Sequence, residues 1–166
     1  MELKTPNTES EYKASVDEKG NVVLKKKSEI KKGKKSKLSG GQFEMTVRRD
    51  LEEKGWIVDK WSNNFDLENG MVIPARRKFN PFSKVMTIGT GFPDFVCFQL
   101  MKENLYKIIG VEVKINGTLS RDEKLKCRGL LDLKIFSEIR IAKKVKEKNR
   151  VRVSYVDFLE VEKRMR

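Results

Sequence analysis

Two apolar runs that lie close together along the chain constrain its fold more than any other feature. The run PDFVCFQL covers residues 93–100, the run YKIIGVEVK covers residues 106–114, and a polar turn around KEN separates them. Short apolar runs that are bounded by turn residues are typical of β-strands. We therefore expect these two runs to pair as neighbouring strands.

A helix is predicted just upstream, over QFEMTVRRDLEEKGW at residues 42–56. Phe43, Val47 and Leu51 recur there at helical spacing, so they should face the core, and Gly55 is a natural end for the helix. Residues 1–40 hold few large apolar side chains and end in a lysine run closed by glycines. Such a composition cannot offset its ordering entropy by burial, so we expect a flexible basic N-terminal arm.

The remaining elements follow from alternation and capping. WIVDKW, residues 56–61, alternates like a strand that places Trp56, Val58 and Lys60 on one side. Ser120 can cap a second helix, because a turn precedes it and helical spacing follows it. The apolar stripe expected for this second helix consists of Leu125, Leu133 and Phe136. IRIAKKV is expected to be a strand, and VRVSYVDFL a strand or a short helix.

These elements predict an α/β fold with the order α-β-β-β-α-β, in which helices flank a mixed β-sheet. The folded domain should cover residues 41–166. Residues 62–91 are rich in asparagine, glycine and proline, so we expect an insertion or hairpin there. A chain of 166 residues is long enough for one domain with a buried core.

Composition narrows the classes of function. The chain has 37 Lys+Arg against 24 Asp+Glu, a net charge of +13, which favours a polyanionic partner such as nucleic acid over a merely solvated basic surface. It has no histidine, which excludes Ser-His-Asp and Cys-His nucleophile systems and histidine metal sites. Neither of its two cysteines lies in a C-x-x-C pair, and no signal peptide or membrane span is apparent. We therefore expect an intracellular, cytoplasmic protein.

Acidic residues near the two apolar runs form the most chemically suggestive set. Alternation along residues 106–114 places Glu112 and Lys114 on the same side of their strand, and Asp94 begins the preceding run. If the strands pair, Asp94 approaches Glu112, and two close carboxylates suit a hard cation such as Mg²⁺ or Mn²⁺. Lys114 could then position a water molecule or stabilise charge on a phosphate. Alternatively, Glu112 and Lys114 form a solvent-facing ion pair and Asp94 is a turn residue.

The ordered set GFPD at residues 91–94 and EVK at residues 112–114 resembles the paired signature of the PD-(D/E)xK nuclease superfamily. Residues 40–56 are similar to the first helix of the archaeal Holliday-junction resolvases and their relatives. The resemblance implies a restriction-endonuclease-like core and a catalytic set of Glu44, Asp94, Glu112 and Lys114. It also implies that Asp94, Glu112, the Val113 carbonyl and Glu44 bind Mg²⁺ or Mn²⁺. Glu44 could instead only complement its helix dipole.

Residues 117–120, GTLS, resemble the turn and helix start of the VRR-NUC branch of this superfamily. A glutamine commonly follows three residues after the serine in that branch, whereas this chain has Glu123. Ser120 and Glu123 also spell S-x-x-E, a capping box, which we favour over a catalytic role for Glu123.

Basic side chains are expected to bind the nucleic acid. The candidates are Arg48, Arg49, Arg76, Arg77, Lys78, Lys124 and Arg128. Arg48 lies one turn from Glu44, so it either lines the same cleft or pairs with that acid. The cluster at residues 76–78 adjoins Phe79 and Phe82, which fits a strand-splitting or backbone-clamping element as well as an ordinary solvated loop. The N-terminal arm either contacts DNA or only promotes solubility.

The predicted function is that of a metal-dependent endonuclease that hydrolyses DNA, in repair or recombination, with an archaeal or viral source fitting the resemblance. Resolving a junction would require two active sites on a symmetric homodimer, whereas a flapped substrate would not. The alternative is a non-catalytic basic nucleic-acid-binding module with the same fold. Carboxylates in a DNA-binding cleft repel phosphate, which argues against that alternative.

Overall fold

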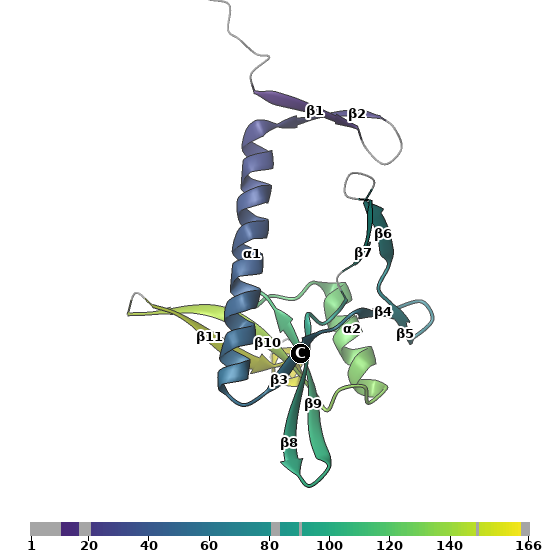
Figure 1. Cartoon of the computed structure of the whole chain (residues 1–166), viewed down its shortest axis with the longest axis vertical. Helices are drawn as coiled ribbons and strands as arrows, with labels where there is room; N and C mark the ends of the chain where they lie inside the picture. Colours follow the sequence, from purple (N-terminus) through teal and green to yellow (C-terminus); the bar gives the residue numbers. More distant parts are fainter. Residues whose placement is uncertain (1–10, 17–20, 81–83, 90, 149, 164–166) are drawn as a thin grey trace, which may run out of the picture. The chain divides into compact units, whose positions relative to one another are not determined.

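The computed structural model describes residues 11–16, 21–80, 84–89, 91–148 and 150–163, and Figure 1 shows its elements. The chain divides into two compact units, Met1–Gln42 and Phe43–Arg166. Residues 1–10 and 17–20 of the predicted arm lie outside the described residues. Within the described ranges, no helix combines the length and the apolar character that crossing a membrane requires.

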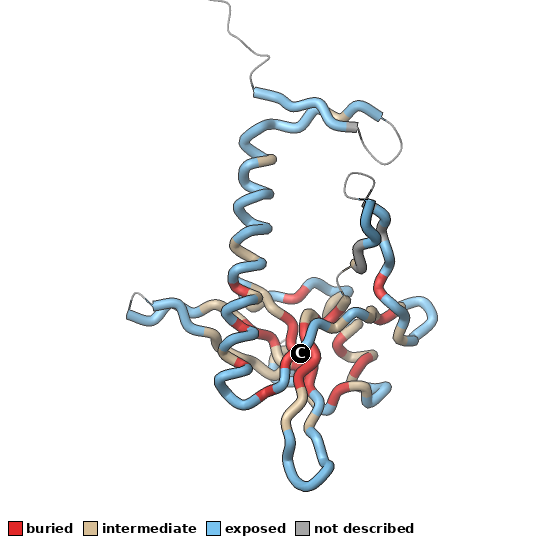
Figure 2. The backbone as a smooth tube through the Cα atoms, viewed as in Figure 1, coloured by how far each residue is buried: buried red, intermediate tan, exposed pale blue. Residues whose placement is uncertain are grey.

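The first unit contains a hairpin of β1 (Tyr12–Val16) and β2 (Val22–Lys26) and the beginning of α1 (Lys27–Glu53). The helix begins at Lys27, well before the expected start near residue 42, so it includes residues of the predicted arm. The segment contains no proline, and its lysines favour a helix while its three glycines disfavour one. None of the described residues in 11–42 is buried (Figure 2).

The second unit is built on a five-stranded mixed sheet in the order β11-β10-β9-β8-β3. Its strands are β3 (Ile57–Lys60), β8 (Phe95–Lys102), β9 (Leu105–Val113), β10 (Glu138–Glu147) and β11 (Arg150–Asp157). β9 and β10 are parallel, with α2 (Arg121–Asp132) between them in the chain, and the other neighbours are antiparallel. The predicted α/β class and the pairing of the two apolar runs are confirmed. Among the sheet strands and the helices that pack on them, α1, β3, β8, β9, α2 and β10 follow one another as predicted, and β11 and α3 (Phe158–Lys163) come after them.

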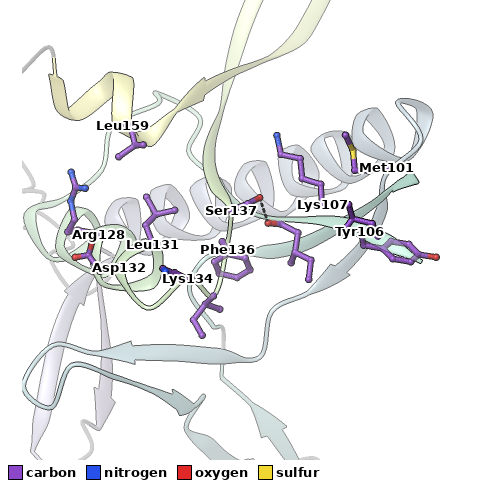
Figure 3. Close-up of a pocket in the computed structure, with 13 residues that line it drawn as sticks. Met101, Tyr106, Lys107, Arg128, Leu131, Asp132, Lys134, Phe136, Ser137 and Leu159 are labelled. Atoms are coloured by element: carbon purple, nitrogen blue, oxygen red, sulfur yellow. Dashed lines mark hydrogen bonds between the residues drawn. The ribbon is translucent and has the colours of Figure 1, made fainter. Parts of the chain in front are cut away.

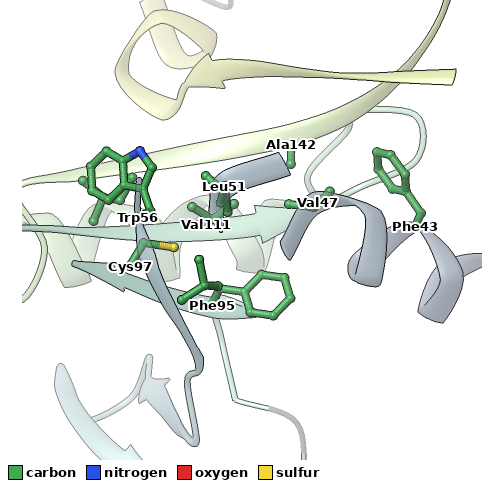
Figure 4. Close-up of a cluster of buried hydrophobic side chains, with 10 residues drawn as sticks. Phe43, Val47, Leu51, Trp56, Phe95, Cys97, Val111 and Ala142 are labelled. Carbon is green, nitrogen blue, oxygen red and sulfur yellow. The ribbon is translucent and has the colours of Figure 1, made fainter. Parts of the chain in front are cut away.

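Each face of this sheet carries its own hydrophobic cluster. On one face, the predicted residues Phe43, Val47 and Leu51 of α1 pack against Val111 and its neighbours on the strands (Figure 4). On the other face, α2 and α3 pack on the sheet through residues such as Leu130. The sheet is therefore the middle layer, with α1 on one face and α2 and α3 on the other.

The region predicted as an insertion or hairpin contains two hairpins. β4 (Asn63–Asp66) pairs with β5 (Met71–Pro74), and β6 (Arg77–Asn80) pairs with β7 (Val85–Ile88). A Cβ atom at Gly129 of α2 would lie 2.2 Å from the ring of Phe65, so glycine lets the first hairpin pack directly on the helix. Residues 81–83 and 90, which include Phe82, lie outside the described part.

The predicted apolar stripe of the second helix is partly wrong. Leu125 and Leu133 are 49% and 47% exposed, whereas Cys127 and Leu130 are fully buried. Phe136 is buried as predicted, but it lies beyond the end of the helix. The helix advances about 100° per residue, so Leu125 lies on the side away from Cys127. The prediction chose the large side chains of Leu125 and Leu133 for the core, whereas the helix buries Cys127 and Leu130.

Candidate active site

Asp94 and Glu112 are brought together by the antiparallel pairing of β8 and β9. Phe95 pairs with Val111, so Asp94 and Glu112 occupy the next positions along the two strands. The Val113 N–H donates to Asp94 Oδ2 at 2.9 Å, and the Asp94 N–H donates to Glu112 Oε2 at 3.2 Å. Each carboxylate is therefore held by the backbone of the other strand.

The segment that leads into Asp94 is packed tightly against the chain that follows β3. A Cβ atom at Gly91 would lie 2.1 Å from the carbonyl oxygen of Trp61 and 2.4 Å from that of Asn63. The Phe92 N–H donates to the Asn63 carbonyl at 2.9 Å, and the Trp61 N–H donates to the Asp94 carbonyl at 3.2 Å. Only glycine allows this close approach, which places Asp94 beside the end of β3.

Burial and like charge act together on the two carboxyl groups. Glu112 is only 5% exposed and is the one buried charged residue in the described ranges. Burial, followed by the charge of Asp94, raises the pKa of Glu112 to about 8, although Lys114 acts in the opposite direction. Burial also raises the pKa of Asp94, against the hydrogen bond from Val113, and the charge of Glu44 raises it further. Burial thus outweighs the positive charge of Lys114 at both carboxyl groups.

Lys114 lies between two carboxylates. Its Nζ is 3.0 Å from Glu112 Oε1 and 2.5 Å from Glu123 Oε1. Burial acts to lower the pKa of Lys114, but the hydrogen bond to Glu123 and the charge of Glu112 outweigh it and raise that pKa. Lys114 therefore stays an ammonium group at neutral pH.

Glu123 has two roles, of which the sequence indicated one. Its Oε2 accepts a hydrogen bond from the Ser120 N–H at 2.7 Å, and its N–H donates to Ser120 Oγ at 3.3 Å, which confirms the capping box. The other carboxylate oxygen contacts Lys114, which the sequence analysis did not anticipate. Only a short turn joins the end of β9 to this helix, so the sequence could have indicated that Glu123 lies near Lys114.

Glu44 is turned toward a residue that the sequence analysis had not selected. Its Oε2 lies 2.5 Å from Nζ of Lys60, at the end of β3, and that ammonium also lies 4.6 Å from the ring centroid of Phe95. Trp56 and Val58 pack against α1, and alternation places Lys60 on the same side of β3 as these two residues. The sequence could therefore have indicated that Lys60 lies near α1.

Of the residues predicted to bind a metal ion, the structure brings together Asp94 and Glu112. Val113, whose carbonyl was also predicted to bind the ion, follows Glu112 directly in the chain. In the ranges that are described, no group of three or more His, Cys, Asp or Glu side chains is arranged to hold a metal ion. Two carboxylates with raised pKa values nevertheless fit a hard divalent cation, because oxygen is the ligand such ions prefer.

Arg48 pairs with another acid than Glu44. Its Nε lies 2.9 Å from Glu52 Oε1, and its Nη2 donates to the Val58 carbonyl at 2.9 Å. Arg48 therefore links α1 to β3 and does not pair with Glu44.

The other predicted basic residues are distributed over several elements. Arg128 pairs with Glu162 of α3 and lies over the ring of Phe158, so it also joins two helices. Arg49, Arg76 and Arg77 are exposed and Lys124 is half-buried, while the side chain of Lys78 lies outside the described part.

A pocket of about 840 Å³ lies away from the two carboxylates, toward the opposite end of β9 (Figure 3). Its walls include Tyr106, Ile108 and Phe136, together with Arg128 from α2. Of the predicted site residues, only Arg128 lines it. The carboxylate pair therefore lies at the strand ends of the sheet and not in this pocket.

Comparisons of the chain with protein-family models, curated proteins and solved structures found no match. The function is therefore inferred from the side chains described above.

Proposed function

We propose that this protein is a Mg²⁺- or Mn²⁺-dependent nuclease that hydrolyses DNA phosphodiester bonds. The observation that carries the proposal is the pair of Asp94 and Glu112, each held by the backbone of the other strand, with the ammonium of Lys114 at 3.0 Å from Glu112. Burying a carboxylate beside another carboxylate is costly unless a cation compensates them. A net charge of +13 supplies the attraction for a polyanionic substrate.

The proposal includes a restriction-endonuclease-like core, as the PD-(D/E)xK resemblance implies. In support, α1 precedes the antiparallel strands β3, β8 and β9, and α2 leads to the parallel strand β10. The two motifs of the resemblance, residues 91–94 and 112–114, adjoin each other at the ends of β8 and β9.

The chain's own residues would divide the chemistry as follows. Asp94, Glu112 and the Val113 carbonyl would hold the ion, which supplies Lewis-acid charge against the phosphate oxygens. Lys114 remains protonated, so it would stabilise negative charge on the phosphate and would not act as a base. Water would form the new P–O bond and release a proton to solvent, the bridging P–O bond would break, and the leaving oxygen would take a proton from solvent.

The test is a cleavage assay with branched, flapped, single-stranded and plain duplex DNA in Mg²⁺, Mn²⁺ or EDTA. Asp94→Asn and Glu112→Gln should each lower the cleavage rate by roughly 10²–10³-fold or more while DNA binding is retained. Glu138→Gln is the matched control, because Glu138 is also a strand carboxylate paired with basic groups, Lys107 and Arg140, but it lies away from Asp94.

Three results would each decide a different point. Binding without cleavage in either metal would support the non-catalytic nucleic-acid-binding module instead. Full cleavage by Glu112→Gln would refute the site assignment. Cleavage of junctions at paired positions would favour a symmetric homodimer, whereas cleavage of flaps alone would not require one.

A further inference from the structure

Lys60 is the positively charged group that the structure places between α1 and the start of β8. Its ammonium contacts Glu44 of α1 at 2.5 Å and lies 4.6 Å from the ring of Phe95, the residue that follows Asp94. In the antiparallel register, Lys60 is directly opposite Phe95. The contacts of Lys60 therefore join the helix that carries Glu44 to the strand that carries Asp94.

The carboxyl group of Asp94 is influenced by both members of this pair. Two positive groups, Lys60 and Lys114, favour its charged form, and Glu44 opposes it. Lys114 is already engaged by Glu112 and Glu123. Lys60 thus contacts Glu44 directly, and its charge also acts on Asp94.

We propose that Lys60 is an internal counter-ion that holds Glu44 in the metal-free protein and competes with the divalent cation for it. This positioning role rests on the proposed metal-dependent function and deepens it. The side chains of Lys60 and Glu44 are 50% and 33% exposed, and an ion pair of such exposure is held weakly, so it opens readily. Glu44 would then be free to act as a third carboxylate for a cation that Asp94 and Glu112 hold.

Removal of the Lys60 charge should therefore tighten cation binding. Lys60→Met frees Glu44 and makes the surroundings of Asp94 more negative. One unit charge at the edge of a partly solvated site changes an apparent Kd by about threefold to tenfold. Lys60→Arg keeps the charge and should bind the cation as the wild type does.

Lys54 provides a closely matched control. Its Nζ lies 2.7 Å from Asp50 near the end of α1 and 4.7 Å from the ring centroid of Tyr155, so it makes the same two kinds of contact as Lys60. It is not among the main causes of the pKa shift of Asp94, whereas Lys60 is. Lys54→Met removes one positive charge elsewhere, so it separates a local effect from a change in net charge.

The experiment is a Mn²⁺ titration of the EDTA-treated full chain, followed by calorimetry and by the electron paramagnetic resonance signal of free Mn²⁺, without DNA. The expected result is a threefold to tenfold lower Kd for Lys60→Met, no change for Lys60→Arg or Lys54→Met, and loss of the gain when Glu44→Gln is added to Lys60→Met. Thermal melts of each variant verify folding.

The outcomes separate the two proposals. An unchanged or weaker Kd in a folded Lys60→Met protein overturns the role of Lys60, and so does equal tightening in Lys54→Met, while Mn²⁺ binding by the wild type leaves the proposed function standing. If neither the wild type nor any variant binds Mn²⁺, both the proposed function and the role of Lys60 are wrong.

Discussion

Replacement of Glu112 by glutamine should remove most of the pH dependence of stability between pH 5 and 8 in the metal-free protein. The pKa of Glu112 rises from the ordinary value of 4.5 to about 8 in the folded state. The folded state therefore retains a proton on this group that the unfolded state has lost above pH 4.5. Its contribution to stability is fully present below pH 4.5 and is lost as the pH rises toward 8.

The magnitude follows from the size of the shift. Each pKa unit corresponds to about 1.4 kcal/mol, so ionising Glu112 in the folded state costs roughly 4–5 kcal/mol by the time the pH exceeds 8. Within that window, the free energy of unfolding should fall by about 1.4 kcal/mol per pH unit. The chain has no histidine, so imidazole titration does not obscure the slope.

Urea unfolding in EDTA at pH 5.5, 6.5, 7.5 and 8.5 would measure the slope. The wild type should lose stability steadily across this range, while Glu112→Gln should stay nearly flat. Glu138→Gln should keep the wild-type slope, because Lys107 and Arg140 outweigh burial and lower the pKa of Glu138. A flat wild-type profile, or the same slope in Glu112→Gln, would show that Glu112 is not a buried acid with a raised pKa.

Three further predictions concern the same elements. Because a cation must displace the proton of Glu112, Mn²⁺ affinity should rise about tenfold per pH unit below pH 8, with calorimetry in two buffers reporting one released proton; a pH-independent affinity would contradict this. Leu130→Ala should lower the free energy of unfolding by about 2–5 kcal/mol and Leu125→Ala by about 0.5 kcal/mol in urea titrations; similar losses would contradict the observed helix face. Gly91→Ala should destabilise the protein by at least 1–3 kcal/mol and weaken Mn²⁺ binding, since its Cβ atom would meet the Trp61 carbonyl; wild-type melting and affinity would refute that packing.

Much of the sheet was predictable because its signals are local. The strands at residues 95–102 and 105–113 are short apolar runs with a turn between them, and antiparallel pairing then follows from proximity along the chain. The same pairing determines the register that brings Asp94 to Glu112. The sequence alone therefore predicts that two residues separated by 18 positions lie side by side.

Other features depended on information that is not local. The start of α1 at Lys27 reflects helix propensity without burial, and a rule based on apolar periodicity cannot detect it. The buried face of α2 depends on where Ser120 starts the helix and on what packs against it, so the small residue Cys127 is buried in place of Leu125. The contact between Glu44 and Lys60 joins a helix to a strand end. Its geometry depends on how α1 packs on the sheet, which the local sequence does not specify.

The charge balance of the site explains why acids matter in so basic a protein. Asp94, Glu112 and Glu123 supply three carboxylates, and Lys114 supplies one ammonium. Glu44 and Lys60 form a pair that adds no net charge. When all of these groups are ionised, two negative charges remain, which is the charge that one divalent cation neutralises. Without the cation, the site can approach neutrality only by retaining protons. The raised pKa values of Asp94 and Glu112 agree with this, because a raised pKa means that a carboxyl group keeps its proton to a higher pH. Burial is the largest cause of both raised pKa values and neighbouring carboxylates add to it, so binding of a proton and binding of a cation both relieve the cost of holding ionised carboxylates here.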